Sequence, residues 1–163
     1  LFNKSQEKNK KMGTTIVTLA TFDNQVVVYN IGDSSAYGLT KDNEMSVVTV
    51  EDSFVGALIS AGAITQEEAK THPERHVLTQ ALATRDNINL HTFIDDLSKY
   101  DYFLLCSDGL TNMMENEEIQ DIVRNNELSI SVEKLIELCV NRGGVDNISV
   151  AIIKNLGGVN HDK

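Results

Sequence analysis

Three aspartates stand beside short apolar segments, and this placement constrains the fold more than any other feature of the sequence. Each lies two residues from a run rich in Val, Ile, Leu and aromatic residues. The pairs are Asp33 after 25–31, Asp108 after 102–106 and Asp146 before 148–153. Runs of this length and composition are typical of β-strands. The sequence therefore places three carboxylates at strand ends, where a sheet can hold them at fixed positions.

Turn residues between apolar runs predict the other strands. Segments 14–20 and 25–31 are separated by Phe-Asp-Asn at 22–24, and this spacing predicts a β-hairpin. Further strands are expected at 36–39, 46–50 and 88–94. We expect the first four strands to follow one another as an antiparallel meander.

Capping residues and apolar periodicity predict the helices. Asp52 or Ser53 can cap a helix that runs to Ser60, and the Thr65-x-x-Glu68 spacing is that of a capping box. Two later stripes have helical spacing: Ile119, Ile122 and Val123, then Val132, Leu135, Ile136 and Cys139. The last strand, 148–153, is apolar at its end and is expected to be central. Strands, then helices, then a returning strand predict an α+β fold.

Composition limits the classes of partner. The chain of 163 residues is 41% hydrophobic, which suffices for one domain with a core, and no apolar run approaches the roughly 20 residues of a membrane span. A formal net charge of −10 opposes binding to nucleic acid. Cys106 and Cys139 lie in apolar segments and are expected to be small core residues of a cytoplasmic protein, with one intramolecular disulfide left open.

Four short motifs follow one another in a distinctive order. They are Met-Gly-Thr-Thr at 12–15, Gly-Asp-Ser at 32–34, Ser-Asp-Gly-Leu-Thr at 107–111 and Gly-Gly-Val-Asp-Asn-Ile-Ser-Val at 143–150. In this order they resemble the bacterial branch of the metal-dependent PP2C-type serine/threonine protein phosphatases. The resemblance implies a sandwich of two antiparallel β-sheets flanked by helices. It assigns residues 1–155 to a partial catalytic domain with a flap at about 51–82, and leaves 156–163 as a loose tail.

The same resemblance implies a metal site. Asp108 and Asp146 are expected to hold the second catalytic ion, and Asp33 an additional, more weakly held ion shared with Asp108. The cofactors would be two catalytic Mn²⁺ or Mg²⁺ ions and a third. Carboxylates this close repel one another unless cations neutralise them, and paired divalent ions suit phosphoryl chemistry. A turn residue that caps the backbone at 34–35 is the alternative for Asp33.

Three further residues are expected to support these aspartates. Gly109 would permit a tight turn, Asn147 would orient Asp146 or satisfy the turn backbone, and Ser34 flanks Asp33. None is expected to bind metal itself.

Two residues of the flap segment are candidates for substrate gating. Ser53 is expected to cap a helix rather than to act as a nucleophile. His72 suits a general acid because imidazole titrates near neutral pH, but its place in the flap beside proline favours a structural or gating role. The remaining histidines, His76, His91 and His161, show no partner in the sequence.

The chain departs from the family pattern at several places. Ser35 stands where an arginine is common, Glu-Asp-Ser at 51–53 where Asp-His-Ser is common, and Ala83 where glycine is common. The family's initial arginine, which holds the substrate phosphate, and its metal-bridging Asp-Gly pair do not precede Met12. We therefore expect the later two-thirds of a catalytic domain, nearly inactive by itself, with exposed edges open to self-association.

The leading hypothesis is hydrolysis of phosphoserine and phosphothreonine in proteins, opposite a cognate serine/threonine kinase and acting on its substrates. The alternative is a non-catalytic module that keeps the fold to bind a protein partner. An acidic Ca²⁺-binding domain is a weaker third hypothesis because no Asp-x-Asp-x-Asp-Gly loop is present.

Overall fold

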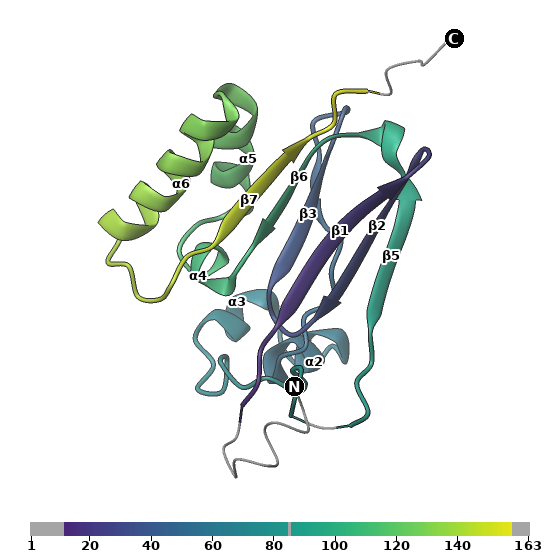
Figure 1. Ribbon diagram of the computed structural model, residues 1–163. Coiled ribbons are helices and arrows are strands. Elements are labelled where there is room, and N and C mark those ends of the chain that lie inside the picture. Colours follow the sequence, from purple (N-terminus) through teal and green to yellow (C-terminus); the bar gives the residue numbers. More distant parts are fainter. Residues whose placement is uncertain (1–11, 85, 158–163) are drawn as a thin grey trace.

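Two antiparallel β-sheets pack face to face in the computed structural model, which describes residues 12–84 and 86–157 (Figure 1). One sheet has the order β1-β2-β5, with strands Ile16–Phe22, Gln25–Ile31 and His91–Asp96. The other has the order β4-β3-β6-β7, with strands Met45–Val47, Ser35–Thr40, Tyr100–Cys106 and Val150–Lys154. Helices cover the outer face of this second sheet. The predicted α+β sandwich is confirmed.

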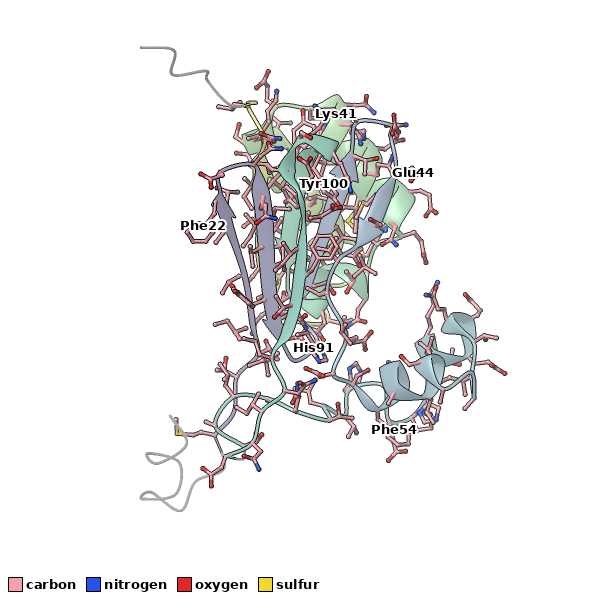
Figure 2. The ribbon with its side chains drawn as sticks, turned by 90° about the vertical axis from the view of Figure 1, so that its right-hand side faces the viewer. Phe22, Lys41, Glu44, Phe54, His91 and Tyr100 are labelled. Atoms are coloured by element: carbon pink, nitrogen blue, oxygen red, sulfur yellow. The ribbon has the colours of Figure 1, made fainter. Side chains whose placement is uncertain are left out.

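The predicted first hairpin is present, but β1 is shifted by two residues from the predicted 14–20, so that Phe22 lies in the strand rather than in the turn. β1 and β2 pair from Ile16 opposite Ile31 to Phe22 opposite Gln25, and Asp23 in the connecting turn has a φ of 50°. Asp tolerates this left-handed conformation better than most residues do. The hairpin turn lies at the end of the molecule remote from His91, as the labelled side chains in Figure 2 show.

The predicted four-stranded meander is wrong, because β2 and β3 lie in different sheets. The chain crosses between the sheets at residues 32–34, where Gly32 has a φ of +102° that favours glycine. β3 is buried on both faces: Ala36 packs between the sheets, and Tyr37 and Leu39 pack beneath the helices. A strand apolar on both faces fits an interior position of the second sheet better than a place beside β2.

Side chains along β6 point to the two faces of its sheet, so this one strand contributes to two hydrophobic cores. Phe103 packs between the sheets near Tyr100, whereas Leu104 and Cys106 pack beneath the helices. β7 is an edge strand within the described part of the chain, so the prediction that it is central is wrong. Val150 and Ile152 pack beneath the helices, whereas Ala151 and Ile153 on the other face are exposed, so an apolar run does not show how many strands flank it.

The first two helices begin at the predicted caps and both apolar stripes lie on helices, whereas α4 and the 3₁₀ turn were not predicted. They are α2 Phe54–Ser60, α3 Gln66–Lys70, α4 Asp108–Thr111, α5 Asn116–Asn125 and α6 Leu128–Asn141, with a 3₁₀ turn η1 at Leu97–Lys99. Ser53 caps α2 by accepting the Gly56 N–H at 2.9 Å, and the Thr65/Glu68 capping box of α3 is present. Residues of both predicted apolar stripes are fully buried: Ile119, Val123, Leu135 and Cys139.

Cys106 and Cys139 are both free and both buried in the core beneath the helices, as expected for small core residues. No helix among residues 12–84 and 86–157 has the length and apolar character needed to cross a membrane. The predicted tail lies mostly outside the described residues, as does His161.

Candidate metal centre

The turn that carries Asp33 is packed tightly against the start of β1. A Cβ added to Gly32 would lie 2.3 Å from Thr15 Cγ2, so this position has room only for glycine. Ser34 Oγ and Thr15 Oγ1 share a hydrogen bond of 2.9 Å. Ser34 therefore supports the turn, in agreement with its predicted place in the site.

Asp108 and Asp146 lie on two segments that main-chain groups and the Ser107 side chain hold together. The Ser107 N–H donates to the Ser149 carbonyl at 3.0 Å, and Ser107 Oγ donates to the Asn147 carbonyl at 3.2 Å. Asp108 is then the first residue of α4. Asp146 Oδ1 accepts the Asn147 N–H at 2.7 Å, so Asn147 helps to orient this carboxylate through its backbone.

Gly109 is needed for a different reason from the predicted tight turn. It lies inside α4, and an added Cβ would be 2.3 Å from the Asn147 carbonyl oxygen. The missing side chain therefore lets the start of α4 approach the loop that carries Asp146. This close approach brings the ends of β6 and β7 together at one place.

The pKa of Asp33 shows that the three aspartates share one electrostatic environment. Burial raises this pKa most, and the negative charge of Asp108 raises it next, with smaller contributions from Glu51 and Asp146. The charges of both other aspartates and of Glu51, a carboxylate that the sequence analysis did not select, therefore act on Asp33.

The donor chemistry suits a hard divalent cation, because all four of these groups are carboxylates. Yet within the described residues no group of three His, Cys, Asp or Glu side chains is arranged to hold an ion. These carboxylates therefore do not form a complete coordination shell within the described residues. A complete shell needs ligands beyond this set.

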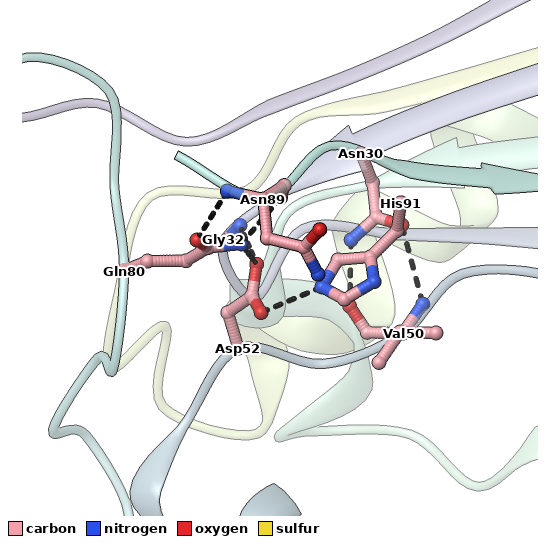
Figure 3. A network of polar contacts seen from close by, with 7 residues as sticks. All are labelled: Asn30, Gly32, Val50, Asp52, Gln80, Asn89 and His91. Carbon is pink, nitrogen blue, oxygen red and sulfur yellow. Dashed lines mark hydrogen bonds and ion pairs between the residues drawn. The ribbon is translucent and has the colours of Figure 1, made fainter. Parts of the chain in front are cut away.

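A polar network beside the Asp33 turn was missed by the sequence reasoning (Figure 3). Asp52 Oδ2 accepts hydrogen bonds from the Gly32 N–H and from Gln80 Nε2, both at 2.8 Å. Asp52 Oδ1 lies 2.8 Å from His91 Nε2. The expectation that His91 has no partner is wrong. The contact joins residues 39 positions apart, and local sequence pattern carries no signal for such a pair.

The flap segment folds back on itself next to this network. Ser53 and Leu78 form a β-bridge, and the Thr79 N–H donates to the Asp52 carbonyl at 2.8 Å. A hollow of about 620 Å³ lies between the chain at 13–15 and the returning flap at 78–84. The flap therefore borders an open space next to the Asp33 turn.

The two predicted gating residues have structural contacts. Ser53 is buried, caps α2 and hydrogen-bonds the Glu51 carboxylate. His72 Nδ1 accepts the Glu74 N–H at 3.1 Å, and its ring lies 5.9 Å from the ring of Phe54. These contacts favour the structural interpretation of His72 over the general acid.

Comparison with known proteins gives a consistent result. A family model described as Protein phosphatase 2C matches residues 2–143. Protein phosphatase PhpP of Streptococcus pneumoniae is 41% identical over 148 residues, which are 90% of this chain and 60% of that protein. Serine/threonine phosphatase stp of Listeria monocytogenes is 34% identical over 155 residues, 94% of this chain and 61% of that protein.

Solved structures agree with the sequence relatives. The serine/threonine phosphatase Stp1 from Staphylococcus aureus superimposes with a TM-score of 0.88 at 35% identity, covering 96% of this chain and 62% of that one. The catalytic domain of PstP in complex with two manganese ions has a TM-score of 0.77 at 31% identity, covering 92% and 63%. The chain thus spans about 60% of the length of the relatives it matches.

Proposed function

Because the chain belongs to the protein phosphatase 2C family, we propose that it supplies metal ligands to an enzyme that hydrolyses phosphoserine and phosphothreonine in proteins. One observation carries the proposal. Asp33, Asp108 and Asp146 come from three distant strand ends, yet the charges of the latter two raise the pKa of the first. A fold that gathers carboxylates at such an electrostatic cost suits a cation at that place.

Each aspartate has a separate role in the proposal. Asp108 and Asp146 would hold the second catalytic Mn²⁺ or Mg²⁺, and Asp33 would share an additional ion with Asp108. When bound, two divalent ions supply a water of lowered pKa and positive charge near the phosphoryl oxygens. The chain's own part is to fix its carboxylates in place: Ser107 and Gly109 hold the two loops in register.

We propose that this chain alone has little activity. The described residues form no complete group of metal ligands, and the relatives have further length that this chain does not match. Removing even an outer partner of a metal ligand lowers affinity or activity by about 10–100-fold. The absence of a ligand that bridges two ions should cost more.

A second candidate is a non-catalytic module that binds a protein partner through the same fold. The observation that favours it is the lack, within residues 12–84 and 86–157, of three grouped ligands able to hold an ion. In that case the aspartates would be remnants of a site rather than a working part of one.

The substrates of the catalytic proposal are phosphoproteins, with a cognate serine/threonine kinase acting in the opposite direction. The names of the relatives, a protein phosphatase and a serine/threonine phosphatase, support this class of substrate.

Two buried cysteines without a disulfide support a reducing compartment such as the cytoplasm.

The proposal includes self-association through the edge strands β1 and β7. Between these strands lies a hollow of about 260 Å³ whose apolar lining includes Leu19, Phe103, Ile153 and Leu156. Leu156 is 85% exposed, and edge strands offer unpaired backbone groups to a second copy. Sedimentation velocity over a concentration series tests this: a dimer is expected, and a monomer at all concentrations would exclude it.

The decisive experiment is Mn²⁺-dependent hydrolysis of a phosphothreonine peptide. It compares this chain with a fusion that carries, at its N-terminus, the part of the pneumococcal relative outside the matched region. We expect little activity from the chain alone and strong activity from the fusion. Asp108→Asn or Asp146→Asn in the fusion should abolish that activity, whereas Asp42→Asn, in an exposed turn, should leave it unchanged.

The outcome separates the two candidates. A well-folded, metal-supplied fusion without activity would favour the binding module. Activity that survives both aspartate substitutions would contradict the assigned ligands while leaving the enzyme class intact.

A further inference from the structure

Asp52 is a buried carboxylate for which the proposed chemistry has no use. Asp52 is only 8% exposed, and each of its two carboxylate oxygens has at least one hydrogen-bond partner. A buried charge costs several kcal/mol of desolvation unless hydrogen bonds and a partner compensate. A residue kept in this position therefore needs a reason in the structure.

The first reason is a direct connection to the Asp33 turn. Asp52 and Gly32 are joined twice: the Asp52 N–H donates to the Gly32 carbonyl at 3.0 Å, and the Gly32 N–H donates to Asp52 Oδ2 at 2.8 Å. Gly32 immediately precedes Asp33. The orientation of the Asp33 backbone is thus set from the flap segment across the crossover between the sheets.

The second reason is that the same carboxylate joins the start of the flap segment, where Asp52 lies, to its returning part at 78–82 and to the first sheet. Gln80, on the returning part, donates to Asp52 Oδ2 and also to the Asn89 carbonyl at 2.7 Å. His91 begins β5 and reaches Asp52 Oδ1. Figure 3 shows the Gln80 and His91 side chains and the Gly32 backbone converging on Asp52 from three separate segments.

The third reason is the chemistry of the partners. The Gly32 N–H and the Gln80 amide are donors, and His91 Nε2 donates when it carries its proton. Only an ionised carboxylate accepts from three donors without presenting one of its own. When His91 Nε2 carries the proton, asparagine at position 52 would direct its NH₂ group at that donor, so this tautomer requires the carboxylate and not only its size.

The family pattern at this position adds a contrast. The resemblance places a histidine where this chain has Asp52, between Glu51 and Ser53. The contact with His91 thus belongs to this chain's own sequence and is not implied by the motif.

We propose that Asp52 is a positioning residue that fixes the Asp33 turn and the flap relative to one another, with Gln80 and His91 as its partners. The proposal rests on the proposed role of Asp33 as a ligand of the additional metal ion. It adds that the affinity for this ion is set from the flap segment, by a side chain that does not touch the ion.

A matched control exists on the same strand. Asp95 lies at the other end of β5 and also accepts three hydrogen bonds, from Lys99 Nζ at 2.6 Å and from the Tyr100 hydroxyl and Asp96 N–H at 2.8 Å. Asp95→Asn removes a comparable carboxylate far from the Asp33 turn. Any effect common to both variants reports general stability.

The test measures Mn²⁺ binding and backbone protection in this chain by NMR. Because the proposed ion at Asp33 is shared with Asp108, the titration is repeated in an Asp146→Asn background, which removes the ion held by Asp108 and Asp146. Paramagnetic broadening of the Gly32 and Ser34 amides in that background reports the first binding event, and the additional broadening at Gly109 in the unaltered chain reports the second. We expect Asp52→Asn to weaken the first binding event about 10-fold, as loss of an outer partner typically does, and to leave the second unchanged. It should also speed hydrogen exchange at the Gly32 amide. Asp95→Asn should do neither.

A second pair of variants covers the case in which Asp52→Asn does not fold. His91→Gln keeps a donor for Asp52, whereas His91→Leu removes it. Binding near Asp33 should be retained in the first and weakened in the second. Equal binding in both variants would overturn the proposal.

Two results would overturn the proposal directly. One is unchanged Gly32 exchange and Mn²⁺ affinity in Asp52→Asn; the other is an equal loss in Asp52→Asn and Asp95→Asn, which would make the role merely structural. If the unaltered chain shows no broadening at any of these amides, the metal site itself fails. The exchange rate of the Gly32 amide then still decides whether Asp52 fixes the turn.

Discussion

The two halves of the candidate metal centre are held in place by different means. The Asp33 turn depends on side chains from distant segments, chiefly Asp52 and Thr15. The segments of Asp108 and Asp146 depend chiefly on backbone groups, namely the Ser107 N–H and the Asn147 and Ser149 carbonyls, with Ser107 Oγ as a bridging side chain. Side-chain contacts can change with single substitutions, whereas main-chain contacts persist as long as the strands pair. The comparison explains why one half can vary while the other keeps its motif.

The departures from the family pattern follow this division. Ser35, Asp52 and Ala83 lie in the turn or the flap segment, on the side of the site that side chains hold. The motifs around Asp108 and Asp146 match the family without such changes.

The largest effect is expected for Gly32→Ala, which alters the Asp33 turn, the half of the site that side chains hold. The left-handed conformation costs about 1–2 kcal/mol for a non-glycine residue, and overpacking typically costs about 1–3 kcal/mol. The new Cβ would meet Thr15 Cγ2 at 2.3 Å and its Cα at 3.2 Å, at a φ of +102°. Urea unfolding should show a loss of about 3 kcal/mol in the free energy of unfolding.

Gly62→Ala is the control for the conformational part of this cost. Gly62 also has a positive φ, +68°, but no atom lies within 4 Å of an added Cβ. It should lose only about 1 kcal/mol, the cost of the backbone conformation alone. Equal losses in both variants would show that contact with Thr15 does not constrain the turn.

A somewhat smaller effect is expected for Gly109→Ala, which alters the contact between the start of α4 and the Asp146 loop. The added Cβ would lie 2.3 Å from the Asn147 carbonyl oxygen, and backbone atoms cannot rotate away as a side chain can. We expect a loss of about 2 kcal/mol in unfolding free energy, within the usual range for overpacking. Mn²⁺ broadening near Asp108 should weaken as well, because α4 must move away from the Asp146 loop.

Asn112→Ala serves as the control in the same region. It removes only the contact of 3.3 Å from Asn112 Nδ2 to Asp108 Oδ2, on an exposed side chain. A change within about 0.5 kcal/mol is expected, as for most exposed substitutions. If Asn112→Ala weakened Mn²⁺ binding more than Gly109→Ala, side chains would hold this half too, and the comparison would fail.

The sequence predicted those features that depend on local pattern. Thr65 and Glu68 identify a capping box by spacing alone, and the presence of the hairpin, though not its register, follows from two apolar runs and a short turn. The α+β class followed from the order of these elements. Strand order did not, because β7 and β6 are apolar on both faces alike and only one of them has strands on both sides in the described structure.

The same limit applies to the site. Asp33, Asp108 and Asp146 were found because a carboxylate beside a strand and a glycine is a local signal. Asp52 was read only as a possible helix cap, and His91 seemed unpartnered, because their contact spans 39 positions of sequence. A buried charge and its partner are joined by the fold, so the sequence shows each of them but not the pair.

The smallest effect, and one of opposite sign, is expected for Asp33→Asn in the metal-free protein. Burial and the charge of Asp108 raise the pKa of Asp33 above its ordinary value of 3.8, so its ionised form destabilises the folded state. Replacing it by a neutral amide should raise the free energy of unfolding at pH 7 by roughly 0.5–1 kcal/mol, at the low end of stabilising substitutions. Unfolding in urea with EDTA measures this.

The dependence on pH separates this charge effect from packing. A raised pKa in the folded state means that the contribution of Asp33 to stability falls as pH rises above 3.8, and that below this value Asp33 is protonated in both states. The advantage of Asp33→Asn should therefore vanish at pH 3 and reach its full size at pH 7. Asp42→Asn, in an exposed turn, should show no such trend. If Asp33→Asn raised the free energy of unfolding equally at both pH values, the carboxylates would not repel one another. The Asp33 turn would then have no need of a cation.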